Sequence, residues 1–160
     1  MTFQIYTDGY FDMNDQVGSS AVVILDSAGH SAMIEYARAR QVKYDPEKKQ
    51  RINEQEVGAC IRALMLLPDG ADCVIYSDSQ YAVNVLNKTW EAKANLELID
   101  RFYKELTSRN IKCELKWVRG HNGDFWNERA DELCEQVAHD LRVGGKGYFH
   151  RDYTSRDEKI

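Results

Sequence analysis

The spacing of the apolar residues changes near residue 53, and this change limits the folds open to the chain. Before it, apolar and polar residues alternate in three stretches, 3–8, 17–26 and 31–39, which predicts three β-strands. After it, apolar residues recur every three or four positions, which predicts helices separated by two further short strands. A strand meander followed by alternating helices and strands is typical of one mixed α/β sheet.

The predicted elements give a five-stranded sheet flanked by helices. Helices are predicted over residues 53–67, 95–109 and 127–141, with a short one ending near residue 87, and strands over 73–76 and 111–118. We expect the first three strands to pair antiparallel, and strands four and five, which helices connect, to run parallel to the first. Residues 1–141 form one predicted domain, and residues 142–160 a charged C-terminal extension that is at most partly ordered.

The composition is that of a single globular domain. The chain has 160 residues, 43% of them hydrophobic and 29% charged, which is enough to bury a core without metal or disulfides. The longest apolar run, 21–25, is far shorter than the ~18 residues of a membrane span. The N-terminus has no signal-peptide pattern, so we expect a cytoplasmic monomer with no membrane partner. The cysteines lack metal-binding spacing and are interpreted as buried thiols (Cys60, Cys73, Cys113 and Cys134).

The net charge of −5 by itself speaks against a nucleic-acid partner, because such affinity comes from cations that neutralise phosphates. A cluster of carboxylates that binds cations would also lower the net charge, so the position of the acids matters.

Two acidic residues lie at the ends of predicted strands. Asp8 ends the first strand and Asp78 the fourth. If these strands are parallel neighbours, both carboxylates emerge at the edge of the sheet where open α/β folds place ligands. Two more acids flank the apolar stripes of helices, Glu56 in a first turn and Asp131 in the last helix. Taken singly, each is an ordinary turn, cap or surface residue.

Brought together, these four carboxylates would repel one another unless cations were bound. Carboxylate oxygens suit Mg²⁺ or Mn²⁺ better than zinc. Two such ions can hold the attacking water and the leaving oxygen of a phosphodiester. His121 lies in the glycine-flanked loop 119–123 beside this edge. A lone loop histidine is usually a surface residue, but here it would serve as a proton carrier.

Several segments together resemble ribonuclease H, type 1. They are Tyr6-Thr-Asp8-Gly9, Glu56-Val-Gly-Ala-Cys-Ile-Arg-Ala-Leu, Tyr76-Ser-Asp78-Ser-Gln80-Tyr81, Trp117-Val-Arg-Gly-His121 and Asn127-Glu-Arg-Ala-Asp131-Glu-Leu. Their order and spacing agree over residues 3–140. Each segment alone is a weak signal, whereas the set in sequence is specific.

The resemblance implies a ribonuclease H-like fold and an endonuclease that hydrolyses the RNA strand of RNA–DNA hybrids, producing 5′-phosphomonoesters. It implies two Mg²⁺ ions, with Mn²⁺ as a substitute. By motif, the metal-binding catalytic carboxylates would be Asp8, Glu56, Asp78 and Asp131, with His121 assisting. Gly9, Asn53 and Gln80 would approach the minor groove, where 2′-hydroxyls identify RNA. Asn95 would contribute to a phosphate pocket for the DNA strand.

The chain departs from the family pattern at four places. Tyr10 stands where Ser is common, and Glu54 adds a second acid before Glu56, which makes it the fallback ligand. The basic handle of many members is absent between residues 79 and 110. The basic residues of the 142–160 extension are hypothesised to substitute for it, and truncation at Leu141 would test this.

Two other functions stay open from the sequence. One is a catalytically silent nucleic-acid-binding module of the same fold, and the other is a related polynucleotidyl transferase or exonuclease. Four mutually repelling acids favour an enzyme, because a silent module has no physical need for them. The Asp78-Ser-Gln pattern and the glycine loop before Asp131 favour the hybrid-specific nuclease.

Overall fold

The computed structural model describes residues 2–46, 51–120 and 124–153. Within these ranges the chain forms six strands and four helices. The strands are β1 (Thr2–Asp12), β2 (Val17–Leu25), β3 (Ala32–Gln41), β4 (Asp72–Ser77), β5 (Lys112–Trp117) and β6 (Tyr148–Asp152). The helices are α1 (Arg51–Met65), α2 (Gln80–Leu86), α3 (Leu96–Ser108) and α4 (Phe125–Arg142).

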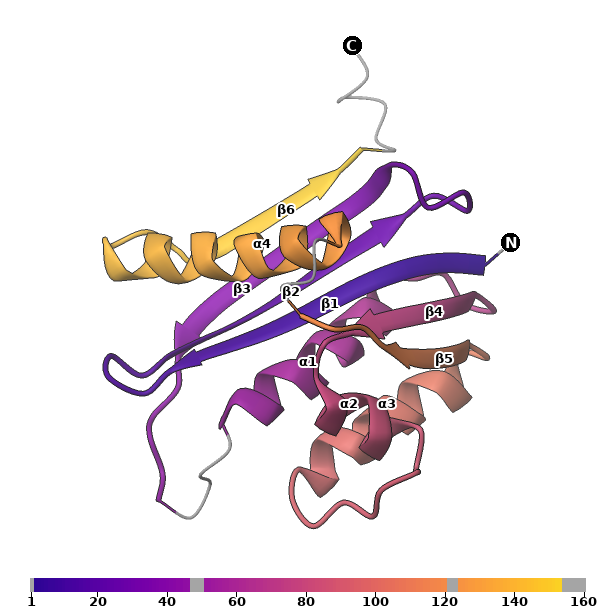
Figure 1. Ribbon diagram of the computed structural model, residues 1–160, viewed down its shortest axis with the longest axis horizontal. Coiled ribbons are helices and arrows are strands. Elements are labelled where there is room, and N and C mark those ends of the chain that lie inside the picture. The colour runs from indigo at the N-terminus through magenta and orange to yellow at the C-terminus, as the bar shows by residue number, and fades with distance from the viewer. Residues whose placement is uncertain (1, 47–50, 121–123, 154–160) are drawn as a thin grey trace.

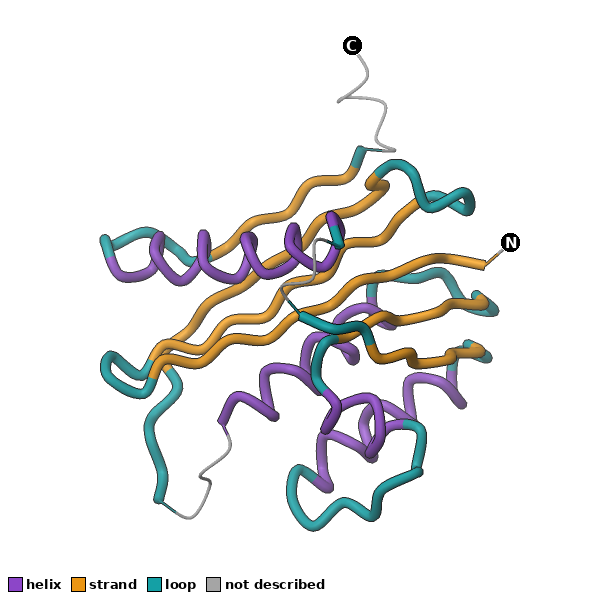
Figure 2. Tube along the Cα trace, in the orientation of Figure 1, coloured by secondary structure: helices purple, strands orange, loops and turns teal. Residues whose placement is uncertain are grey.

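The strands form one mixed sheet in the order β5-β4-β1-β2-β3-β6. β1, β2 and β3 pair antiparallel as two long hairpins, which run side by side in Figure 2. β4 pairs parallel with β1, and β5 pairs parallel with β4. The predicted α/β class and the predicted strand directions are therefore confirmed.

The predicted number of five strands is wrong, because residues 148–152 add a sixth. β6 pairs antiparallel with β3, from Arg38↔Tyr148 to Ile34↔Asp152. The short strand is mostly exposed, so no apolar alternation marked it in the sequence. Backbone pairing with the open edge of β3 holds it, together with the Tyr148 ring 5.7 Å from that of Tyr36.

The first strand also differs from its prediction. The sequence predicts that it ends at Asp8, but β1 continues to Asp12 and pairs with β2 as far as Asp12↔Val17. Backbone hydrogen bonds to β2 outweigh the weak strand preference of Gly9. Asp8 therefore lies within a strand and not at its end.

The helices cover both faces of the sheet, α1, α2 and α3 on one and α4 on the other (Figure 1). The unbroken apolar run of β2 follows from this arrangement. Val22 and Ile24 pack against the α1 side, whereas Ala21 and Val23 pack against α4. A strand covered on both faces needs apolar residues at every position. No helix among the described residues has the length and apolar character required to cross a membrane.

Candidate active site

The register of β1 and β4 brings two acidic residues to the same level of the sheet. The last paired residues are Tyr6 and Tyr76, whose rings stack at 4.9 Å. Asp8 and Asp78 each lie two residues after this pair, and they reach the same level because neighbouring parallel strands rise by the same distance per residue. β4 ends at Ser77 while β1 continues, so space for these side chains opens beyond the end of β4.

Close packing of α1 on β1 brings Glu56 to Asp8. A Cβ added to Gly9 would lie 2.5 Å from the Glu56 nitrogen and 2.6 Å from the Gln55 carbonyl carbon, so only glycine permits this approach. The backbone N–H of Gly9 also donates a hydrogen bond to the Glu56 carboxylate. Gly9 therefore has a clear role in positioning Glu56, independent of any contact with substrate.

Three carboxylates form a compact cluster. Asp8, Glu56 and Asp78 each offer an oxygen, and these oxygens all lie within 4.8 Å of one another. Asp8 and Glu56 are only 4% and 5% exposed. Asp131 of α4 approaches from the opposite face of the sheet, close enough for its charge to help raise the pKa of Asp8.

The structure separates Glu56 from the fallback residue Glu54. Glu54 forms an ion pair with Arg51 at 2.8 Å and is half-buried at the other side of the helix start. Glu56 is buried beside Val57, which packs into the core on the α1 side. The core register of α1 thus brings Glu56, and not Glu54, to the cluster.

Burial makes the ionised form of this cluster unfavourable. Burial and the charges of Glu56, Asp78 and Asp131 raise the pKa of Asp8 well above its usual value. Burial and the Asp78 charge raise the pKa of Glu56 to about 8. A cation bound between the carboxylates would reverse both effects.

The donor set fits a hard divalent cation. It consists of carboxylate oxygens, and one of them, Oε2 of Glu56, is buried with no hydrogen-bond partner among the described residues. A buried oxygen of this kind is normally satisfied, and a metal ion would satisfy it. Oxygen ligands suit Mg²⁺ or Mn²⁺. The residues present therefore fit the predicted metal.

Several supporting residues were not singled out from the sequence. The Trp117 indole N–H donates to the carbonyl oxygen of Asp78 at 3.2 Å. The Cys134 thiol lies 3.5 Å from the carbonyl oxygen of Asp8. Asp124 caps α4 by accepting from the backbone N–H groups of Trp126 and Asn127. The signals in the sequence were a tryptophan at a strand end and an aspartate before a helix, both too common to interpret alone.

His121 lies in residues 121–123, outside the described residues, so its role stays a prediction. The described chain approaches the cluster one residue earlier. A Cβ on Gly120 would lie 2.8 Å from Oδ2 of Asp78. The backbone therefore passes directly beside the carboxylates at the residue before His121.

The four residues predicted to contact substrate lie around the helix starts. Asn53 is one helical turn before Glu56, and Gln80 begins α2 two residues after Asp78. Asn95 precedes α3 in a left-handed conformation (φ 60°), and its side-chain amide donates to the Tyr81 hydroxyl at 3.1 Å. Gly9 packs against α1, as described above. Their contacts with substrate stay predictions.

Comparisons with known proteins agree with this geometry. The RNase H family model matches residues 1–139. The chain is 31% identical over 147 residues to a ribonuclease H of Francisella tularensis subsp. novicida, covering 85% of this chain and 90% of the relative. It is 32% identical over 146 residues to a ribonuclease H of Hahella chejuensis, covering 83% and 90%.

Two solved structures have the same fold. RNase H1 of the halophilic archaeon Halobacterium salinarum matches with a TM-score of 0.71 at 21% identity, over 88% of this chain and 99% of that one. The N-terminal RNase H domain of a Mycobacterium tuberculosis protein, fused to maltose-binding protein, matches with a TM-score of 0.69 at 18% identity, over 89% and 96%. The sheet thus has an RNase H-like fold.

The chain belongs to the RNase H family. At the level of the family it is a ribonuclease, a hydrolase that cleaves nucleic acid.

Proposed function

We propose that this protein is an endonuclease that hydrolyses the RNA strand of RNA–DNA hybrids with two Mg²⁺ ions, leaving 5′-phosphomonoesters. It would act as a monomer in the cytoplasm, and Mn²⁺ would substitute for Mg²⁺. The observation that carries the proposal is the cluster of Asp8, Glu56 and Asp78, with Asp131 close enough for its charge to act on Asp8. This cluster is unfavourable as a purely structural feature, because its acids are buried and repel one another.

Each part of the chain has a defined task in this proposal. When bound, divalent ions would stabilise charge on the reacting phosphate and activate water. The four carboxylates would hold the ions, and the close approach of Gly9 to α1 positions Glu56. The hydrogen bond from the Trp117 indole N–H to the Asp78 carbonyl oxygen holds the end of β4 in place. His121 would carry a proton to or from the site.

Substrate selection would follow from groups around the cluster. Gly9, Asn53 and Gln80 would contact the minor groove of the hybrid, where a 2′-hydroxyl marks the RNA strand. Asn95 would bind a phosphate of the DNA strand. Its amide is held by Tyr81, the residue after Gln80, so the two predicted contacts are mechanically linked.

The hypothesis that the C-terminal extension replaces the basic handle needs a modified test. Arg142 forms ion pairs with Asp12 and Asp15, so much of its charge is neutralised. Truncation at Leu141 would also remove β6 and expose the edge of β3. Replacing Lys146 and Arg151 by Gln leaves the strand in place. A raised Michaelis constant in that variant would support the hypothesis, and an unchanged one would contradict it.

The deciding experiment is cleavage of a labelled RNA–DNA hybrid with Mg²⁺, beside duplex RNA and duplex DNA. We expect only the RNA strand of the hybrid to be cut. Asp78→Asn should abolish cleavage while the circular-dichroism spectrum stays native. Asp72→Asn is the matched control, an exposed aspartate on β4 outside the cluster, and should retain activity. Hybrid binding without cleavage under Mg²⁺ or Mn²⁺ would refute the nuclease and favour a silent binding module.

A further inference from the structure

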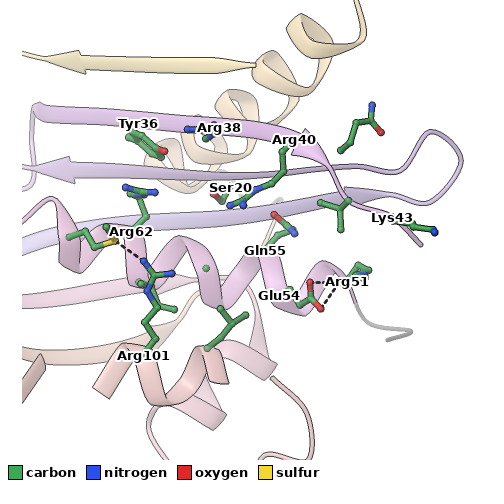
Figure 3. Close-up of a pocket in the computed structure, with 16 residues that line it drawn as sticks. Ser20, Tyr36, Arg38, Arg40, Lys43, Arg51, Glu54, Gln55, Arg62 and Arg101 are labelled. Atoms are coloured by element: carbon green, nitrogen blue, oxygen red, sulfur yellow. Dashed lines mark hydrogen bonds and ion pairs between the residues drawn. The ribbon is translucent and has the colours of Figure 1, made fainter. Parts of the chain in front are cut away.

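A basic groove of about 380 Å³ lies between β3 and α1, beside the region where α3 begins (Figure 3). Its cations come from β3, α1, α3 and one position in the connection after β3: Arg38, Arg40, Lys43, Arg51, Arg62 and Arg101. Glu54 is the carboxylate among the lining residues, and it is paired with Arg51. This concentration of positive charge stands out in a chain whose net charge is −5.

Within residues 2–46, 51–120 and 124–153, the arginines at the centre of the basic groove have no acidic ion-pair partners. In the part of the chain that the structure describes, no ion pair joins a carboxylate to Arg38, Arg40, Arg62 or Arg101. Arg62 instead lies over the Tyr36 ring, 5.0 Å from its centroid. By contrast, the arginines elsewhere that hold the fold together, such as Arg129, are paired with acids. Converging like charges are unfavourable unless an anion binds between them.

The cations are arranged in rows. Arg38 and Arg40 are alternate residues of β3, hence roughly 7 Å apart on one face. Arg51 and Arg62 lie eleven residues apart on α1, a rise of roughly 16 Å. A groove this long with charges along both walls suits successive phosphates of a nucleic-acid strand better than one small anion.

The floor of the basic groove contains a glycine that the packing of the protein does not require. Gly58 lies in the middle of α1, where glycine is less favourable than alanine. A Cβ added there would meet nothing within 4 Å. The missing side chain keeps the floor open between Arg51 and Arg62, as a closely approaching backbone would need.

The basic groove and the active site share the first turns of α1. Gln55 lines the groove, and the next residue, Glu56, belongs to the carboxylate cluster. We propose that the basic groove binds the sugar–phosphate backbone of the hybrid beyond the cleavage site, and so supplies the affinity that a basic handle gives other members. This inference rests on the proposed function. It assigns binding to residues of β3, the middle of α1 and α3, away from the predicted minor-groove contacts.

The test is the salt dependence of hybrid binding by the full-length protein, with metal chelated so that nothing is cleaved. Arg38→Gln/Arg40→Gln should make the slope of log Kd against log salt shallower by about 2, because each lost phosphate contact removes about one. Lys104→Gln/Lys112→Gln removes the same charge from exposed positions outside the groove and should keep the slope. Gly58→Glu, which places an acid on the open floor, should raise Kd and KM.

The outcomes separate this inference from the proposed function. An unchanged slope in the arginine variant, or an equal loss in the lysine control, would overturn the inference. So would groove variants that lose binding of polyglutamate but keep hybrid binding, since that result assigns the groove to an acidic protein. Weaker hybrid binding in the groove variants supports the inference even if the wild type cleaves no hybrid. If the groove variants cleave and bind the hybrid normally, the inference about the groove is refuted and the proposed nuclease function is unaffected.

Discussion

Replacing Glu56 by Gln should stabilise the metal-free protein, although it removes a proposed metal ligand. Burial and the nearby Asp78 charge raise the pKa of Glu56 from 4.5 to about 8. In the unfolded chain this acid is ionised at neutral pH, so metal-free folding takes up a proton. Because the native state binds more protons, the stability of the wild type falls as pH rises from about 4.5 towards 8.

The size of the effect follows from this pKa shift. At pH 7, keeping the carboxyl group protonated costs about 3 kcal/mol, at about 1.4 kcal/mol for each pH unit above the unfolded pKa. Gln has no proton to take up and retains an oxygen to accept from the Gly9 N–H. For a domain of this size, about 3 kcal/mol corresponds to a rise in Tm of about 6–12 °C.

Thermal unfolding followed by circular dichroism measures this directly. In EDTA at pH 7, Glu56→Gln should melt above the wild type, and the difference should shrink near pH 5. Saturating Mg²⁺ should raise the wild-type Tm, because Mg²⁺ at a hundredfold excess over its Kd adds about 2.7 kcal/mol to the free energy of unfolding. The Tm of the variant should rise much less. Glu54→Gln, on the same helix, should not be stabilised in this way. A variant that melts at or below the wild type in EDTA at pH 7 would refute the reasoning.

Three further predictions concern two glycines and one buried ion pair. Gly9→Ala should destabilise the fold by about 1–3 kcal/mol and weaken Mg²⁺ binding, since its methyl group meets the α1 backbone; urea unfolding and calorimetry measure these effects. Gly58→Ala is the matched control, because its methyl group meets open space. It should raise the free energy of unfolding by about 0.5–1 kcal/mol in the same urea experiment. A loss of stability in this variant would contradict the reasoning about both glycines. Burial alone would raise the pKa of Glu35, but hydrogen bonds from Arg129 and Tyr153, with the charges of Arg129 and Arg151, together outweigh burial and lower that pKa. Glu35→Gln should therefore lower the free energy of unfolding by about 1.5–3 kcal/mol at pH 7. The difference in stability between wild type and variant should vanish as the pH falls below the usual pKa range of carboxyl groups. A difference that stays constant with pH in urea unfolding would show that the Glu35 charge is not involved.

Local patterns in the sequence predicted the helices well. The apolar spacing after residue 53 predicted both ends of α1, α3 and α4 to within two residues. The same spacing distinguished Glu56 from Glu54, because Val57 must face the core. A helix carries this information locally, since each residue's direction depends only on its position along a 3.6-residue turn.

Strand pairing was predicted less well, because it depends on distant partners. β1 continues through Asp8 and Gly9 because β2 lies beside it. β6 exists because β3 has a free edge, and its five residues have no marked alternation of their own. In both cases the deciding hydrogen bonds join segments far apart in the chain.

The sequence by itself predicted which residues to expect at the site: four acids in recognisable motifs, two of them at the ends of predicted strands and two on predicted helices. Only the tertiary structure decided what environment these residues share. Burial of Asp8 and Glu56, the shift of the Glu56 pKa and the gathering of arginines from β3, α1 and α3 into the basic groove all depend on distances through space. Electrostatic and desolvation energies arise from such distances, and no local pattern in a sequence encodes them.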